Sequence, residues 1–151
     1  MRIAVLTDTH VGSIQELPGQ MMKALTEVDL IVHAGDFTEM AVLEGLRALG
    51  EVKAVCGNMD SRGIRMVLPR RESFEVSGKT IGIIHGSGTP WGIARRVRDA
   101  FGDVEVVIFG HSRSSCNERL RGTLMFNPGR CCESYGLLTI AEDVKAEIVR
   151  L

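Results

Sequence analysis

Residues 2–10 read Arg-Ile-Ala-Val-Leu-Thr-Asp-Thr-His, and this stretch decides how the rest of the chain is interpreted. Its first part, residues 2–7, is apolar and β-branched, which indicates a strand buried on both faces. Asp8 and His10 follow where that strand should end. Strand ends of an α/β sheet meet in one crevice, so a repeat of this arrangement would gather polar side chains there. Five later segments repeat it with nearby glycines: Gly35-Asp36, Gly57-Asn58-Met59-Asp60, His85-Gly86, Gly110-His111-Ser112-Arg113 and Asn127-Pro128-Gly129.

The first half of the chain alternates strands with helices. Buried strands are expected at residues 2–7, 29–34 and 51–56, and amphipathic helices at 16–27 and 38–49. This βαβαβ order predicts a parallel sheet with right-handed crossovers.

The second half is expected to be mostly antiparallel. Ser77-Gly78, Gly122 and Glu142-Asp143 each separate two short strand-like segments, which predicts three hairpins. Two sheets packed face to face with helices outside would bury both halves, giving an α/β (α+β) fold. No linker is visible, so residues 1–151 are expected to form one domain. The further segments are strands at 72–76, 79–84, 104–109, 118–121, 123–126, 135–140 and 144–150, and a helix at 90–101.

Composition excludes several classes of protein. The formal net charge is −1, which argues against a general binder of nucleic acid or membrane surfaces. No apolar stretch is long enough to span a bilayer. Met1-Arg2 runs directly into the first apolar segment, so no export leader is expected. The four cysteines lack a C-x-x-C pair, and a cytoplasmic location with reduced thiols is therefore expected.

The polar residues at the predicted strand ends suit a metal site. Carboxylates, imidazoles and an amide oxygen together favour a hard or borderline divalent ion, such as Mn, Fe, Ni or Zn. Two such ions side by side can clamp a phosphoryl group and activate water at neutral pH.

The ordered set D-x-H, GD, GNxD, HG, GH and NPG resembles the motifs of the calcineurin-like metallophosphoesterase superfamily. Within it, the chain resembles the small single-domain phosphodiesterases related to the retromer scaffold subunit, over essentially its whole length. The resemblance implies a four-layer αββα sandwich, made of two mixed sheets, with a hydrolase site for two metals.

For the first metal, the resemblance implies Asp8 and His10 as ligands, with Asp36 bridging both ions. The family usually reads GHxH where this chain reads Gly110-His111-Ser112-Arg113, so Arg113 replaces a histidine ligand. A guanidinium stays protonated and has no lone pair for a metal. The first site is therefore expected to be weak, with Arg113 holding a substrate phosphate or neutralising Asp8.

For the second metal, the resemblance implies Asn58, His85 and His111 as ligands. Asn58 would also reach the substrate phosphate, and Asp60 would orient the site from the last position of GNxD. Asn58 and Asp60 are thus the expected catalytic residues. Met59 stands where many members carry a histidine that donates a proton.

The expected activity is hydrolysis of a phosphodiester, or of a phosphomonoester, by metal-bound hydroxide. One or two ions per chain are expected, with Mn favoured and Ni, Fe, Zn or Co as alternatives. A nucleotide is one candidate substrate, and Arg62, the arginine nearest to GNxD, is a candidate substrate contact. The oligomeric state is not indicated, and a homodimer is compatible with the sequence. The alternative is an impaired relative that uses the fold as a scaffold for protein interactions.

Overall fold

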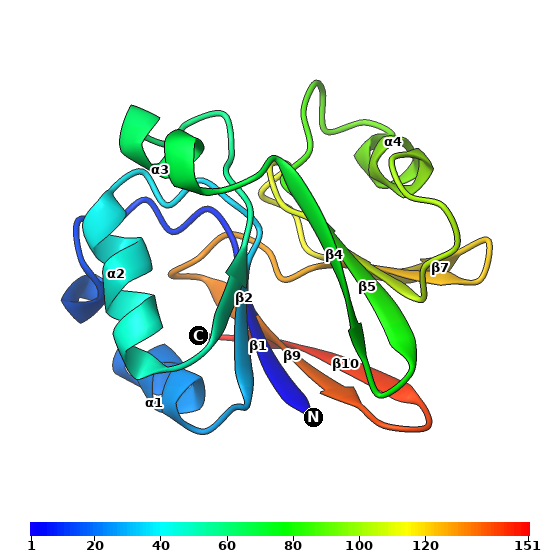
Figure 1. Ribbon diagram of the computed structural model, residues 1–151, viewed down its shortest axis with the longest axis horizontal. Helices are drawn as coiled ribbons and strands as arrows, with labels where there is room; N and C mark the ends of the chain where they lie inside the picture. The colour runs from blue at the N-terminus through cyan, green and yellow to red at the C-terminus, as the bar shows by residue number, and fades with distance from the viewer.

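The computed structural model describes residues 1–151 and contains two five-stranded sheets, each flanked by helices on its outer face (Figure 1). The first sheet has the order β10 (Val144–Arg150), β9 (Ser134–Ile140), β1 (Arg2–Leu6), β2 (Leu30–His33) and β3 (Val52–Ala54). The second has the order β4 (Arg71–Val76), β5 (Lys79–Ile84), β6 (Val106–Ile108), β8 (Thr123–Asn127) and β7 (Cys116–Leu120). The helices are η1 (Ile14–Glu16), α1 (Gly19–Thr26), α2 (Met40–Leu49), α3 (Arg62–Val67) and α4 (Ile93–Asp99).

The strand directions confirm the expected βαβαβ half. β1 pairs in parallel with β2, and β2 pairs in parallel with β3. All three predicted hairpins are present, as β4–β5, β7–β8 and β9–β10. The last hairpin completes the first sheet, because β9 lies antiparallel to β1. The second sheet is mixed, since β6 runs parallel to both of its neighbours, β5 and β8.

Three apolar cores separate the four layers of the sandwich. Alternate side chains of β1 point to opposite faces, so Ala4 and Leu6 pack toward α1 and α2, whereas Ile3 and Val5 pack toward the second sheet. A third, smaller core lies under α4. All four of these β1 side chains are at most 1 % exposed, which explains why the strand is a continuous apolar run. The αββα architecture is thereby confirmed.

The structure differs from the sequence predictions at two helices, α3 and α4. The segment before Pro69 forms α3, whose first turn is capped by Ser61: its Oγ accepts a hydrogen bond from the Ile64 N–H, at 3.4 Å. Helix α4 begins at Ile93, later than the expected residue 90, because Gly92 has a left-handed backbone conformation (φ 71°).

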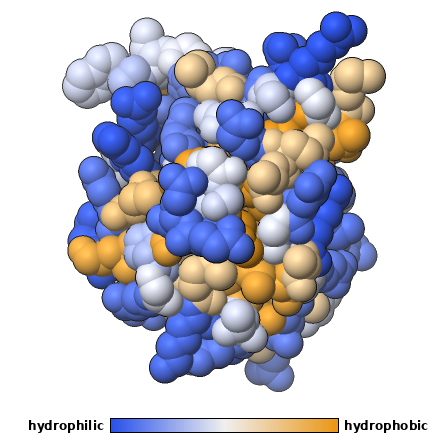
Figure 2. All heavy atoms as spheres, turned by 90° about the vertical axis from the view of Figure 1, so that its left-hand side faces the viewer, coloured by the Kyte–Doolittle hydropathy of each residue, from blue (hydrophilic) through white to orange (hydrophobic).

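Figure 2 shows the face formed by the helices that cover the first sheet. Hydrophilic side chains cover most of this face, and apolar side chains appear between them in separate groups. None of the helices is long and apolar enough to cross a membrane.

Candidate metal centre

The predicted ligands lie on loops that follow the strands at one end of the sandwich. Asp8 and Asp36 follow the parallel strands β1 and β2, while His85 and His111 follow β5 and β6 of the other sheet. Hydrogen bonds join the loops across the two sheets: the His111 N–H donates to Asp8 Oδ2 at 3.2 Å, and His85 Nδ1 donates to the Ala34 carbonyl at 2.8 Å. The two sheets therefore share one polar centre.

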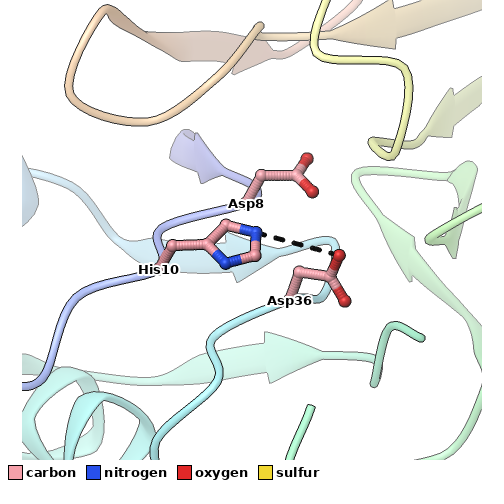
Figure 3. A group of neighbouring side chains, drawn as sticks. All are labelled: Asp8, His10 and Asp36. Atoms are coloured by element: carbon pink, nitrogen blue, oxygen red, sulfur yellow. Dashed lines mark ion pairs between the residues drawn. The ribbon is translucent and has the colours of Figure 1, made fainter. Parts of the chain in front are cut away.

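Asp8, His10 and Asp36 form its first part (Figure 3). One ligand atom from each of the three lies within 4.8 Å of the others, which is close enough for a single ion to contact all three. His10 Nε2 is 3.9 Å from Asp36 Oδ2. Both carboxylates are buried, whereas the side chain of His10 is 34 % exposed.

His85 brings an imidazole from the second sheet to the same carboxylates. Its Nε2 is 3.1 Å from Asp36 Oδ2 and 3.8 Å from Asp8 Oδ1. This nitrogen is buried, and neither contact has the geometry of a hydrogen bond. Since Nδ1 donates to a carbonyl, the neutral ring directs the Nε2 lone pair toward two carboxylates. That arrangement is unfavourable unless a cation, or a proton on Nε2, lies between them. The donor set therefore fits a divalent metal.

Each buried ligand has one atom fixed by the protein and another left free. Asp8 Oδ2 accepts hydrogen bonds from Thr7 Oγ1 (2.9 Å) and the His111 N–H, which leaves Oδ1 facing the centre. Asp36 Oδ1 accepts from the Met59 N–H at 2.8 Å, which leaves Oδ2 facing His85 and His10. Such outer hydrogen bonds orient metal ligands in proteins.

His111, at the edge of the centre, also has one ring nitrogen fixed by the protein and the other left free. Its Nε2 donates to the Gly88 carbonyl at 2.9 Å, so Nδ1 is the nitrogen that keeps a lone pair. The His111 and His85 rings meet edge to face, with their centroids 5.3 Å apart. Asn58 is exposed and lines a cavity together with His85.

Asp60 is the residue that organises the loops. Its carboxylate accepts hydrogen bonds from the backbone N–H groups of Asp36 (3.0 Å), Thr38 (2.9 Å) and Gly57 (2.7 Å). It thus joins the loop after β2 to the loop after β3. These bonds act on the backbone, so Asp60 positions the loops that carry Asp36 and Asn58.

Burial and neighbouring charges shift the pKa values of Asp8, Asp36 and His85. Burial raises the pKa of Asp8, and the neighbouring His85 charge only partly offsets this. Burial also acts to raise the pKa of Asp36, but the close approach and charge of the His85 ring, together with the Met59 N–H, outweigh it, so this pKa is lowered. For His85, burial alone would lower the pKa, yet Asp36 and Asp8 together raise it. The two carboxylates therefore favour a positive charge at His85, the position where a metal would bind.

The loops of the centre hold unusual backbone conformations. Nine residues other than glycine have positive φ; of these, Ser77 and Arg121 lie in hairpin turns, and the other seven lie around the centre. Strained backbone of this kind concentrates at functional sites. Those seven are Asp8, His10, Asp36, Thr38, His111, Arg113 and Cys132.

Two glycines are required by close approach to the ligands. A Cβ on Gly57 would collide with the carboxylate of Asp36, and one on Gly110 would collide with Thr7 Oγ1 and approach Asp8 Oδ2. The glycines of GNxD and GH therefore make room for the ligand carboxylates.

The arginines lie around the centre in two groups. Arg113 lines a cavity of about 300 Å³ with Asp8 and His10. Arg130 lines the same cavity and was missed, although it directly follows the NPG turn. Arg65 and Arg70 line the cavity beside Asn58. Arg62 is exposed on α3 and lines neither this cavity nor the one that contains Arg113.

His33 is buried behind the centre as a neutral ring. Its Nδ1 accepts the Gly35 N–H at 3.0 Å, so Nε2 carries the hydrogen that faces Thr9 Oγ1 at 3.1 Å. The ring stacks on Phe37 with a centroid separation of 3.6 Å. Burial lowers its pKa to about 3. His33 therefore supports the Asp8–His10 loop through Thr9 and is not itself a ligand.

Acidic and imidazole ligands at the strand ends of an αββα sandwich define a metal-dependent phosphoesterase. The comparisons with known proteins agree with that class. The chain belongs to the calcineurin-like phosphoesterase superfamily, whose domain profile matches residues 1–143.

Individual relatives span nearly the whole chain. A probable metallophosphoesterase of Methanocaldococcus jannaschii is 35 % identical, over 99 % of this chain and 81 % of its own length. A phosphodiesterase of the same organism is 26 % identical over 99 % of both chains. Among solved structures, Vps29 of Entamoeba histolytica in complex with zinc has a similar fold, with a TM-score of 0.77 and 24 % identity over 99 % of both chains.

Proposed function

We propose that this protein hydrolyses a phosphodiester with the help of one or two divalent ions, of which manganese suits the donor set best. The observation that carries the proposal is the paired arrangement of the buried ligands, each with one atom fixed and the other directed into a shared centre. When bound, the ions would lower the pKa of water and stabilise negative charge on the phosphoryl oxygens.

The residues of the chain would divide this work as follows. Asp8 and His10 would hold a first ion, Asn58, His85 and His111 would hold a second, and Asp36 would contribute to both sites. The exposed amide of Asn58 also contacts a phosphoryl oxygen. Asp60 fixes the position of the Asp36 loop relative to the Asn58 loop through its three backbone hydrogen bonds.

The arginines supply charge where the first site lacks an imidazole. Arg113 contacts the substrate phosphate from the cavity that it shares with Asp8 and His10. Arg62, exposed at the start of α3, gives weaker long-range attraction to an anionic substrate.

A diester is favoured over a monoester by the phosphodiesterase of M. jannaschii, which aligns with 99 % of this chain. The Asn58–His85 cavity, which extends beyond the metal ligands, gives room for a second ester substituent. A nucleotide diester and a homodimeric state are both compatible with this proposal.

The test is hydrolysis of bis-p-nitrophenyl phosphate by metal-free protein to which Mn, Ni, Co, Fe or Zn is added. We expect Mn-dependent release of nitrophenol, and loss of at least about 10²-fold of that rate in Asp36→Asn, which removes the bridging charge. Metal analysis on the same samples gives the number of ions per chain. A rate at background with every metal would refute the proposal.

Arg113 supports a second candidate, in which the domain acts as a scaffold for protein interactions. A lost imidazole is what a relative without selection for catalysis would show, and Vps29 shares the fold. In that case metal analysis would find no stoichiometric ion at neutral pH, and Asp36→Asn would change neither metal content nor rate.

A further inference from the structure

A cavity of about 330 Å³ opens beside Asn58 and His85 on the side away from Arg113. Arg65 and Arg70 line it, together with Ser87 from the loop that follows β5. No carboxylate and no phenylalanine, tyrosine or tryptophan is among its lining residues. The cavity is therefore positively charged, polar, and directly next to the proposed second metal site.

The two arginines of this cavity have no hydrogen-bond partner in the chain, whereas Arg71 and Arg98 do. Arg71 donates a hydrogen bond to the Ala100 carbonyl, and Arg98 donates to the Phe101 and Gly102 carbonyls. Arg65 and Arg70 make no side-chain hydrogen bond and no ion pair within the chain.

The opposite wall of the cavity is fixed. Arg96 donates to the Ser87 carbonyl at 2.7 Å and to the Trp91 carbonyl at 2.7 Å, so the loop that faces Arg65 and Arg70 is held in place.

Cys56 is a buried residue of the lining of this cavity. Arg65 belongs to α3 and Arg70 to the segment between α3 and β4, and both line the same cavity. Two positive charges from neighbouring segments are thus brought to one space.

We propose that this cavity binds a second phosphate group of the substrate, so that the preferred substrate is a phosphodiester with a terminal phosphate on one of its two alcohol groups. This inference rests on the proposed function. Two forked guanidinium groups without acidic partners match the oxygens of a phosphate. A base-stacking pocket would need an accessible aromatic face, and the one ring in this cavity, that of His85, is buried between Asp36, the Ala34 carbonyl and His111. Hydrolysis adds water across the ester P–O bond, the released alcohol takes a proton, and the terminal phosphate remains unchanged.

The kinetic test uses thymidylyl-thymidine with no terminal phosphate, with a 5′-phosphate and with a 3′-phosphate. We expect one phosphorylated form to have a kcat/KM about tenfold or more above that of the unphosphorylated form, with the gain mostly in KM. The Arg65→Gln/Arg70→Gln double variant should bring this ratio close to one. Arg47→Gln, a matched loss of charge at an exposed position of α2, should keep the ratio of the unmodified protein.

A binding test on metal-free protein separates this proposal from the proposed function. Calorimetric titration with thymidine 5′-monophosphate and with thymidine should show that the phosphate tightens binding about tenfold, and that the double variant loses this gain. Circular dichroism checks that the variant is folded.

If the diesters are not hydrolysed but the phosphate-dependent binding needs Arg65 and Arg70, the proposed reaction fails and the anion site stands. If the diesters are hydrolysed at equal rates and the double variant binds and discriminates like the unmodified protein, the anion site is refuted while the reaction stands.

Discussion

Arg113 brings a permanent positive charge into the cavity that Asp8 and His10 line, at the position where the family usually has an imidazole. An arginine cannot ligate a metal, but it can reduce repulsion between the carboxylates and attract a phosphate. A first metal site in this protein would therefore depend on Asp8, His10 and the shared Asp36.

Replacing Arg113 with histidine should strengthen that site. We expect Arg113→His to raise the number of Mn ions bound per chain from about one to about two, and the affinity of the weaker site by about 10–100-fold. Metal analysis after dialysis measures the first effect and calorimetry the second. Arg119→His, on exposed β7, is the control that should leave both unchanged. Equal metal content in all three proteins would show that Arg113 does not occupy the ligand position.

His33 should make stability depend on pH. Its pKa in the folded chain is about 3, below the ordinary value of 6.5, so between these values the unfolded chain binds a proton that the folded chain does not. Its contribution to the free energy of unfolding is complete above pH 6.5 and decreases as the pH falls, by up to about 1.4 kcal/mol per pH unit.

Urea denaturation of metal-free protein across this pH range tests the prediction. The His33→Gln variant keeps the other titrating groups, so it should lose stability less steeply on acidification than the unmodified protein. Parallel stability curves for the two proteins would contradict the assignment of His33 as a buried neutral ring.

At the scale of the elements, β9 approaches the second sheet closely because Gly136 has no side chain. A Cβ at that position would overlap the ring of Phe126 in β8, which is fully buried between the sheets. Gly136→Ala should therefore overpack the central core and lower the free energy of unfolding by about 1–3 kcal/mol. Gly102→Ala is the control, because a Cβ there meets nothing within 4 Å and its φ is not positive. Chemical denaturation of both variants checks the difference, and equal stabilities would exclude the predicted overlap.

The loop elements around the centre should be as sensitive as the core. Gly57→Ala would push a methyl group into the Asp36 carboxylate, so we expect Mn affinity to fall by about 10–100-fold. Gly50→Ala, at an open position after α2, should keep normal affinity. Calorimetric titration with Mn measures both, and normal binding by Gly57→Ala would mean that Asp36 is not a ligand.

Most elements were predictable from the sequence because their apolar residues repeat at the period of the element. β1 is one example, since Ile3 and Val5 pack on one core while Ala4 and Leu6 pack on another, and the result is an unbroken apolar run. α3 was not recognised, because a six-residue helix before Pro69 has too few turns to show a period.

Because α3 was not predicted, the arginine expected to contact the substrate was chosen by its closeness in sequence to GNxD, and this favoured Arg62. The turn of α3 and the residues after it instead place Arg65 and Arg70 in the cavity beside Asn58. That Asp8, Asp36, His85 and His111 gather in one place was predictable, because their positions follow from strand ends. The backbone hydrogen bonds of Asp60 and the free Nε2 of His85 depend on loop conformations that leave no pattern in the sequence.

At the scale of the whole molecule, metal binding should stabilise the fold. An ion that binds only the folded chain adds about 2.7 kcal/mol to the free energy of unfolding at a concentration 100 times its dissociation constant. Thermal unfolding of metal-free protein with increasing Mn should show a rising Tm, and Mg should have a smaller effect on imidazole ligands. Asp36→Asn should make Tm insensitive to Mn. A Tm that does not respond to Mn in the unmodified protein would exclude a resident site.

The proposed ligands come from both sheets, Asp8 and Asp36 from one and His85 and His111 from the other. An ion in the centre is therefore a cross-link between the two halves of the sandwich. It lies at only one end, whereas the N-terminus and the β4–β5 and β9–β10 turns lie at the other (Figure 1). Rigidity should accordingly be graded along the strands. Amide hydrogen exchange in the metal-free protein would be fastest in the ligand loops and nearly unchanged in the opposite turns, so the chain can exchange its ion without opening its core.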